Sequence, residues 1–323
     1  MKWKKVGQIF DPTHLTDRPG WMDSFAQAPN ALIFDDFVRV YFCCRPRPDE
    51  NNQFVSYCAY ADLDRKDLRK VKRVAKSPIL SLGGLGAFDE FGTYPVSIAR
   101  DGEDIIAIYG GWTRCESVPF NISLGYARSS DGGVTFERSG LGPILSHSVN
   151  EPFVVTSPKI RSFNNSWVLA YTAGRKWFYD KDGNPEIIYK LRIAFSDDGV
   201  NWKKLDRDLI PNSIGVDEAQ ACPDIIQVGG KYHMFFCYRH ALDFRTNSSR
   251  SYRLGYASST DLLDWKRDDT QIELDVTPGS WDADMIAYPH VFELDGIIYM
   301  LYGGNGNGKT GFGLAVLEDN LPK

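Results

Sequence analysis

A pair of apolar runs recurs five times along the chain, and each pair predicts a β-hairpin. In the last copy, Pro289 opens the first run and Asp295-Gly296 separates it from the second. Asp-Gly between two apolar runs is a strong hairpin signal. A fixed period over nearly the whole chain predicts a repeat architecture. The prolines that open the copies are Pro29, Pro95, Pro158, Pro223 and Pro289, spaced by 66, 63, 65 and 66 residues.

Each repeat continues with a second pair of runs, and four strands per unit of about 65 residues are typical of a propeller blade. The last repeat has only three strands, but Trp3-Lys4-Lys5 near the N-terminus resembles Trp202-Lys203-Lys204 in the third. We therefore predict an all-β, five-bladed β-propeller with four antiparallel strands per blade. It forms a single domain over residues 1–323, with inner strands that start near residues 29, 95, 158, 223 and 289. The N-terminal strand closes the last blade, which removes an open edge.

The turns of the outer hairpins carry an Asp-box pattern, Ser-x-Asp-x-Gly-x-x-aromatic. Residues 129–136 match it, and residues 196–202 and 259–265 are looser versions. The aspartate is expected to cap backbone N–H groups of the turn, while the aromatic residue packs into the blade. We predict a structural role for these aspartates.

Composition narrows the class of protein. Apolar residues make up 43% of the chain, which is typical of a globular protein, and the net charge of −5 argues against nucleic acid or an anionic membrane as partner. No apolar run is long enough to span a bilayer, and the N-terminus lacks the apolar core of a signal peptide, so we predict a cytoplasmic location. The six cysteines show no metal spacing and favour buried free thiols. We predict no cofactor, and the question of an axial ion stays open.

The strand order predicts where a site lies. Side chains just before each proline and about sixteen residues after it should ring one mouth of the propeller axis. Convergent polar groups at a concave axis favour a binding site, although charged loops can also form only solvated ion pairs. The acids before the prolines are Asp23, Asp89, Glu90, Glu151, Asp217, Glu218, Asp282 and Asp284. The residues after them are Arg45, Trp112, Arg114, Arg175, Lys176, Arg239, Arg245, Asn305 and Lys309.

The proline-led hairpins resemble the five-bladed propellers of glycoside hydrolase families 43, 32 and 130. Tyr288-Pro289-His290-Val291 is similar to the Gly-Pro-His-aliphatic motif of family 43, and Ala221-Cys222-Pro223-Asp224 to the Glu-Cys-Pro-Asp motif of family 32. The chain also resembles the glycosylase-like propellers that accompany surface-polysaccharide genes. The resemblance covers all five repeats, and it implies a carbohydrate-active enzyme.

The chain departs from these families at the catalytic positions. Families 43 and 32 place their acids one or two residues before the prolines, and the acid/base glutamate of family 32 falls on Ala221. Either loop acids a few residues earlier do the chemistry, or hydrolysis by that scheme is lost. The other residues at these positions are Gln27-Ala28, Thr93-Tyr94, Thr156-Ser157 and Ala287-Tyr288.

For the first alternative, we predict hydrolysis of a glycosidic bond in the axial pocket by paired carboxylates. One carboxyl group protonates the leaving oxygen, and another activates water or attacks the anomeric carbon. Glu218 and Glu151 are the preferred acid/base residues, so Glu218→Gln should abolish turnover and leave the fold intact. The predicted catalytic set is Asp23, Glu90, Glu151, Glu218 and Asp284.

The arginines favour an anionic substrate, because guanidinium groups bind carboxylate or phosphate bidentately. Candidates are a uronic or nonulosonic sugar, a phosphosugar, or inorganic phosphate, which would make the protein a phosphorylase as in family 130. A non-catalytic glycan-binding propeller is the alternative from another class, and a protein-interaction propeller is less favoured. The predicted binding set is Arg45, Trp112, Arg114, Arg175, Arg239, His240, Arg245, His290 and Asn305.

Overall fold

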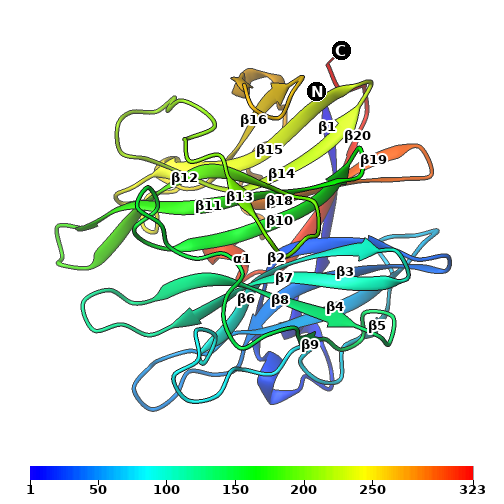
Figure 1. The fold of residues 1–323 in the computed structure, drawn as a ribbon. Helices are drawn as coiled ribbons and strands as arrows, with labels where there is room; N and C mark the ends of the chain where they lie inside the picture. The colour runs from blue at the N-terminus through cyan, green and yellow to red at the C-terminus, as the bar shows by residue number, and fades with distance from the viewer. Residues whose placement is uncertain (323) are drawn as a thin grey trace.

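Five four-stranded antiparallel sheets make up the computed structural model, which describes residues 1–322 (Figure 1). Their first strands contact one another in the cyclic order β2, β6, β10, β14, β18. The predicted five-bladed propeller is therefore confirmed. Blade 1 contains β2 (Ser24–Ile33), β3 (Phe37–Arg45), β4 (Tyr57–Asp64) and β5 (Val71–Val74). Blade 2 contains β6 (Gly92–Asp101), β7 (Asp104–Thr113), β8 (Asn121–Ser129) and β9 (Glu137–Arg138).

The other three blades repeat this order from the axis outward. Blade 3 contains β10 (Val155–Phe163), β11 (Ser166–Tyr179), β12 (Pro185–Ser196) and β13 (Lys203–Lys204). Blade 4 contains β14 (Glu218–Val228), β15 (Lys231–His240), β16 (Arg253–Ser259) and β17 (Lys266–Arg267). Blade 5 contains β18 (Ala287–Leu294), β19 (Ile297–Gly303), β20 (Phe312–Leu317) and β1 (Trp3–Phe10). The short helices are η1 (Pro12–His14), η2 (Gly20–Met22), η3 (Ser248–Arg250), η4 (Asp269–Gln271) and α1 (Asn305–Gly308).

The N-terminal strand closes the ring, as predicted. β1 pairs antiparallel with β20, from Trp3 opposite Leu317 to Phe10 opposite Phe312. Figure 1 shows the blue β1 beside the red β20, with the two chain ends close together. The Trp3 ring also packs edge-on against Phe235 of blade 4, with centroids 5.7 Å apart. The closing strand therefore joins the first part of the chain to its last two blades.

Tight turns connect the first two strands in three blades through consecutive left-handed residues. In blade 5, Asp295 and Gly296 have φ of 52° and 80°, which confirms the predicted hairpin turn. Asn164-Asn165 and Gly229-Gly230 turn in the same way in blades 3 and 4. Such turns match the twist of the flanking strands, and they set the strand register within the blades.

The hydrophobic core lies between neighbouring blades. Ile106 and Ile108 of blade 2 cluster with Leu169 and Tyr171 of blade 3, and the other neighbouring blades pack in the same way. Burying an apolar side chain of this size stabilises the folded state by about 1.5–3 kcal/mol relative to leaving it exposed. Because each blade needs its neighbours to cover both faces, the ring stabilises each of its parts.

The three Asp boxes have the predicted structural role. The carboxylates of Asp131, Asp198 and Asp261 each accept hydrogen bonds from backbone N–H groups of their own turn, at 2.7–3.1 Å. The serine that opens each box donates its hydroxyl to the same carboxylate. These aspartates therefore hold the outer turns of blades 2, 3 and 4.

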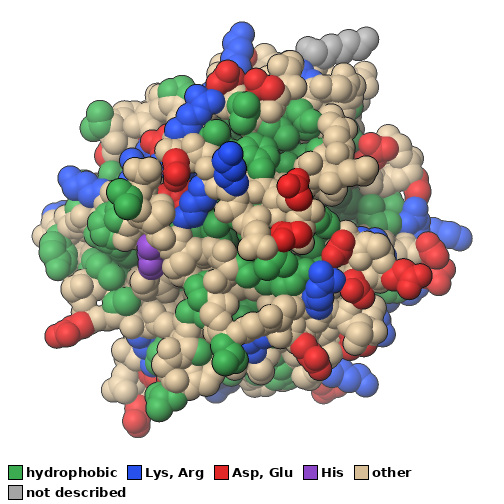
Figure 2. All heavy atoms as spheres, in the orientation of Figure 1, with side chains coloured by type: hydrophobic (Ala, Val, Ile, Leu, Met, Phe, Trp, Pro, Cys, Tyr) green, Lys and Arg blue, Asp and Glu red, His purple; other side chains and the backbone are tan. Residues whose placement is uncertain are grey.

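The charged surface and the cysteines do not point to a particular functional site. Acidic and basic side chains are interspersed on the face shown in Figure 2. Five cysteines are buried free thiols, as predicted, and Cys115 is exposed. Within residues 1–322, no helix has the length and apolar character needed to cross a membrane.

Candidate functional site

A β-bulge at the same place in every blade shapes the mouth of the axis. In each blade, the pairing of the first strand with the second shifts register around the proline. The shift begins two residues before the proline and ends one residue after it. The residue before the proline has a left-handed φ of 51–57° in four blades, and the Tyr94-Pro95 peptide is cis in the fifth. Bulges re-aim side chains next to functional sites. The left-handed residues are Ala28, Ser157, Cys222 and Tyr288.

The re-aimed positions line a cavity with two lobes at this mouth. The lobes have volumes of about 580 and 190 Å³, and both are lined by Gln27, Arg45, Tyr94 and Asn307 among others. Ser157, Cys222 and Tyr288 line the smaller, deeper lobe. Volumes of this order suit a small ligand such as one or two sugar rings.

Four of the five predicted arginines line the cavity, and each of them lies over at least one aromatic ring. The Arg45 guanidinium lies 4.6 Å from the Phe25 ring centroid and 5.3 Å from that of Phe54. Arg239 lies over Phe244 at 3.5 Å. Cation–π contacts of this kind pre-organise the guanidinium plane. The lining arginines are Arg45, Arg114, Arg239 and Arg245.

The four arginines differ in how far their donors are already used. Arg239 donates to the carbonyl oxygens of His240 and Ala241, at 2.9 and 3.2 Å. Arg245 Nε donates to Glu186 at 3.0 Å. Arg114 donates to the Phe54 carbonyl at 3.0 Å.

Arg45 stands apart from the other three arginines. Within residues 1–322, the Arg45 side chain forms no hydrogen bond or ion pair, and its Nε is buried without a partner. A buried donor without an acceptor is costly, so the Arg45 guanidinium has donor capacity that the described protein leaves unused.

The remaining predicted binding residues lie in three different places. Trp112 lines the larger lobe, whereas His290 lies below the cavity floor. Arg175, His240 and Asn305 are outside the cavity lining found in the described chain. Asn305 Oδ1 accepts from the backbone N–H groups of Asp284 and Met285, so it holds the loop before β18.

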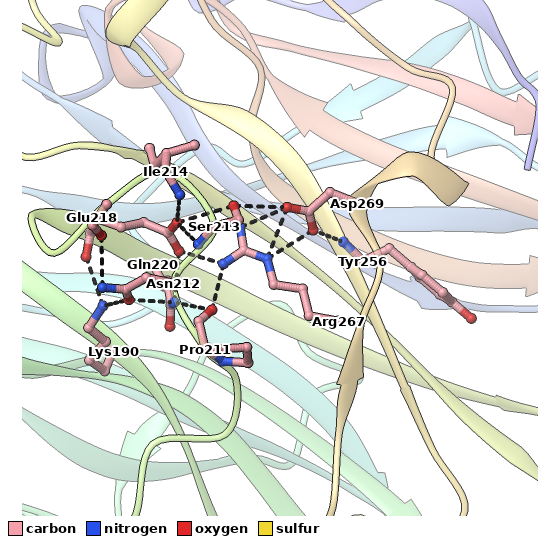
Figure 3. A network of polar contacts seen from close by, with 11 residues as sticks. Lys190, Pro211, Asn212, Ser213, Ile214, Glu218, Gln220, Tyr256, Arg267 and Asp269 are labelled. Carbon is pink, nitrogen blue, oxygen red and sulfur yellow. Dashed lines mark hydrogen bonds and ion pairs between the residues drawn. The ribbon is translucent and has the colours of Figure 1, made fainter.

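The preferred acid, Glu218, lies in a buried polar network (Figure 3) and does not line either lobe of the cavity. Its Oε1 accepts from Arg267 at 2.6 Å, and its Oε2 accepts from the backbone N–H of Ser213 at 2.7 Å. Burial raises the pKa of Glu218, but these donors outweigh burial and lower the pKa below its ordinary value. A general acid needs a raised pKa, and Glu218 has the opposite shift.

The same ion pair recurs in four blades. In each, an acid five to seven residues before the proline pairs with a basic residue on the outermost strand of its own blade. The partner lies outward, so each acid ties the entry of the blade to its outer edge. The pairs are Asp89–Arg138, Glu151–Lys204, Glu218–Arg267 and Asp282–Lys5.

The other three predicted acids are also apart from the cavity. Asp23 pairs with Arg18 at 3.2 Å, the Glu90 carboxylate accepts from the N–H of Gly86, and Asp284 is exposed. Among the described residues, no Asp or Glu side chain lines either lobe. The structure therefore does not bring the five predicted catalytic acids together, and their roles stay predictions.

Below the cavity, residues that directly follow four of the prolines form a polar layer across the axis. The Nδ1 of His290 lies 3.3 Å from Asn30 Nδ2, 3.3 Å from Lys159 Nζ and 3.0 Å from Asp224 Oδ2. Burial lowers the pKa of Lys159 to about 8. Burial and the Lys159 charge lower the pKa of His290 to about 3. This layer separates the cavity from the opposite end of the axis.

Lys159 gives a pH-dependent prediction. The folded-state pKa of Lys159, about 8, lies below the unfolded value of about 10.4. Below pH 8 the buried side chain is charged, and the whole cost of burying that charge lowers the free energy of unfolding. Between pH 8 and 10.5 the folded state releases the proton first, and stability relative to Lys159→Met should rise by up to about 3 kcal/mol. Urea unfolding of both proteins across this range measures the difference, with exposed Lys181→Met as control. A difference that does not change with pH would contradict the assignment.

Several cavity residues escaped the sequence analysis as binding candidates. Phe25, Phe54 and Phe244 hold the arginines, and Gln27 and Asn307 supply polar atoms to both lobes. The signal for Gln27 was present, because it occupies the position two before a proline where the related families place acids. Residues 1–322 contain no group of three or more His, Cys, Asp or Glu side chains that could hold a metal ion.

Sequence comparison finds full-length relatives. The chain is 36% identical over 321 residues to the uncharacterized proteins MT1551 and Rv1502 of Mycobacterium tuberculosis (strains CDC 1551 / Oshkosh and H37Rv), covering 99% of this chain and 100% of each relative. It is 28% identical over 124 residues to the β-1,2-mannobiose phosphorylase of Thermoanaerobacter sp. (strain X514), covering 37% and 35% of the two chains. No protein-family model matches the sequence.

Solved structures share the fold at low sequence identity. A glycoside hydrolase superposes with a TM-score of 0.74 at 18% identity, over 99% of this chain and 94% of the other. A structure from a study of GH130 mannoside phosphorylases and hydrolases has a TM-score of 0.68 at 14% identity, over 100% and 95%. A thermostable family-43 glycoside hydrolase has a TM-score of 0.65 at 12% identity, over 92% and 91%. The chain therefore belongs to the family of MT1551 and Rv1502, and its fold is the five-bladed propeller of the glycoside hydrolase family 43, 32 and 130 type.

Proposed function

We propose that the protein is a glycoside hydrolase-like, carbohydrate-active propeller whose axial cavity binds a sugar with an anionic group, and that Arg45 binds the anion. The observation that carries this proposal is the unpaired Arg45 guanidinium between Phe25 and Phe54. Its fork of donors matches a carboxylate or phosphate. The other lining arginines add positive potential, and no described lining residue is acidic.

The sugar ring has apolar partners in the same cavity. Trp112 and Phe120 line the larger lobe, and aromatic rings offer flat apolar surface to the face of a sugar. The anion at Arg45 and the ring against these side chains fit within the volume of about 580 Å³. The full-length propeller structures named for glycoside hydrolysis support carbohydrate as the ligand class.

A second candidate is glycoside phosphorolysis, in which Arg45 holds inorganic phosphate as the attacking group. The segment related to the β-1,2-mannobiose phosphorylase supports it. Hydrolysis by two carboxylates needs a pair of acids that flank the scissile bond, and the described cavity lining has none. Binding without turnover is the remaining alternative.

One experiment separates these alternatives. Product release is measured by chromatography from neutral and acidic glycosides, each with and without inorganic phosphate. Thermal stabilisation by the same compounds is measured in parallel. Release only with phosphate supports the phosphorylase, and release with water alone supports a hydrolase. Stabilisation without release supports a binding protein.

Arg45→Ala tests the anion site itself. We expect it to weaken binding of acidic sugars about 10- to 100-fold, since a charge-assisted hydrogen bond contributes about 1.5–3 kcal/mol. Titration calorimetry with glucuronic acid and with inorganic phosphate measures the loss. Arg175→Ala is the matched control, because Arg175 lies outside the described cavity lining. Equal affinity of wild type and Arg45→Ala for every anionic compound would refute the proposal.

A further inference from the structure

We propose that Gln27 and Asn307 form a pair of hydrogen-bond acceptors that selects hydroxylated acids, so that the ligand is a sugar acid rather than a bare anion. This inference rests on the proposed anion site at Arg45. Both residues line both lobes of the cavity together with Arg45. They come from opposite ends of the sequence and meet where blade 5 adjoins blade 1.

The orientation of the Gln27 amide is set by its own donor. Gln27 Nε2 donates to the backbone carbonyl of Asn307, so Oε1 must face the other way. A flipped amide would place two oxygen atoms against each other. The side chain is only 2% exposed, and Oε1 has no hydrogen-bond partner among residues 1–322. A buried acceptor without a donor costs about 1–3 kcal/mol.

The side-chain oxygen of Asn307 is a second buried acceptor that lacks a donor among residues 1–322. The Asn307 backbone N–H faces Met285 Sδ at 3.2 Å, and the Asn307 carbonyl accepts from Gln27. Its side-chain Oδ1 is buried and unpartnered within the described chain. Both amide oxygens therefore lack a donor, while Arg45 in the same cavity lacks an acceptor.

The turn that carries Asn307 is built for close approach to Gln27. Gly306, Asn307 and Gly308 have φ of 63°, 59° and 81°, a run of left-handed residues that glycine and asparagine tolerate best. A Cβ atom on Gly308 would meet the Cα of Gln27 at 3.1 Å. The Asn305-Gly306-Asn307-Gly308 sequence thus places the Asn307 amide against blade 1.

These atoms define the chemistry of the ligand. Arg45 supplies donors for an anion, and the two amide oxygens accept from hydroxyl groups. A carboxylate or phosphate on a carbon ring with free hydroxyl groups satisfies all three residues. An anion without hydroxyl groups satisfies Arg45 and leaves both amide oxygens unpaired.

Two ring carboxylates that differ chiefly in hydroxyl groups test the inference. Glucuronic acid and cyclohexanecarboxylate share a six-membered ring and a carboxylate, and titration calorimetry compares them. Wild type should bind glucuronic acid at least about tenfold more tightly. In Gln27→Met and Asn307→Gly, which remove one acceptor each, the preference should fall about five- to tenfold while cyclohexanecarboxylate binding stays within about twofold. Asn307→Gly retains the left-handed turn, so it remains informative if Gln27→Met does not fold.

The outcomes separate this inference from the anion site. Equal losses for both compounds in the two variants, or an unchanged preference, would overturn the acceptor pair. Binding of cyclohexanecarboxylate or phosphate with no preference for glucuronic acid would overturn the acceptor pair and leave Arg45 as the anion site. Binding of none of these compounds by wild type would overturn both proposals.

Discussion

Glu218→Gln is expected to lower the free energy of unfolding by about 3 kcal/mol. The substitution removes the negative charge that faces Arg267, whose side chain is only 4% exposed. It also places an amide NH₂ or a neutral oxygen where backbone N–H groups of Ser213 and Ile214 donate. Breaking one side of a buried ion pair typically costs about 3–5 kcal/mol. Urea unfolding followed by tryptophan fluorescence measures the change.

The control for this variant is Glu90→Gln. Glu90 belongs to the same predicted set, but its carboxylate accepts an exposed hydrogen bond from Gly86 N–H and no other within residues 1–322. We expect a change of less than about 1 kcal/mol there. If Glu218→Gln keeps the wild-type unfolding midpoint and loses a measured turnover, Glu218 would return to the reaction as an acid.

Asp224→Asn is expected to cost about 3–5 kcal/mol, because Asp224 is fully buried and holds three blades together. It accepts from Arg161 of blade 3 at 2.8 Å and from the N–H of Val291 in blade 5 at 2.7 Å. Burial opposes ionisation, but the charge of Arg161 and the hydrogen bond from His290 outweigh it and hold the pKa of Asp224 well below its usual range. This stabilisation is present above pH 4 and is lost as pH falls further towards the folded-state pKa.

Thermal melting from pH 3 to 7 tests the Asp224 prediction. Wild type should lose stability relative to Asp224→Asn as the pH falls below 4. Asp275→Asn is the matched control, since its side chain is 73% exposed, pairs with Arg253 at the surface and accepts an exposed hydrogen bond from Val276 N–H. A constant difference between wild type and Asp224→Asn over the whole range would contradict the depressed pKa.

The fold could be predicted from the sequence because each repeat contains residues that strongly favour a strand start or a tight turn. Pro289, the Asp295-Gly296 turn and the Trp3-Lys4-Lys5 match each correspond to a feature of the structure. The five bulges could not be predicted. The left-handed residues before the prolines are alanine, serine, cysteine and tyrosine, none of which marks a positive φ by its side chain.

Part of the cavity lining follows from the same signals. Counting from the prolines leads to Arg45, Arg239 and Trp112, which line the cavity, since strand length fixes where a second strand ends. Counting identified the loops of the acids but not the direction of their side chains. Glu151 turns outward to Lys204, which lies on a strand 53 residues later in the chain. Only the packing of the blade decides that direction.

The pairing of β1 with β20 has a consequence for synthesis on the ribosome. β1 is made first, yet its partner emerges about 300 residues later, which takes roughly 15–60 s at ordinary elongation rates. During that interval the first eight-residue strand has an unpaired edge. Nascent chains that stall before β20 should therefore expose β1 to proteases and chaperones, and closure of the propeller ring should wait for the synthesis of β20.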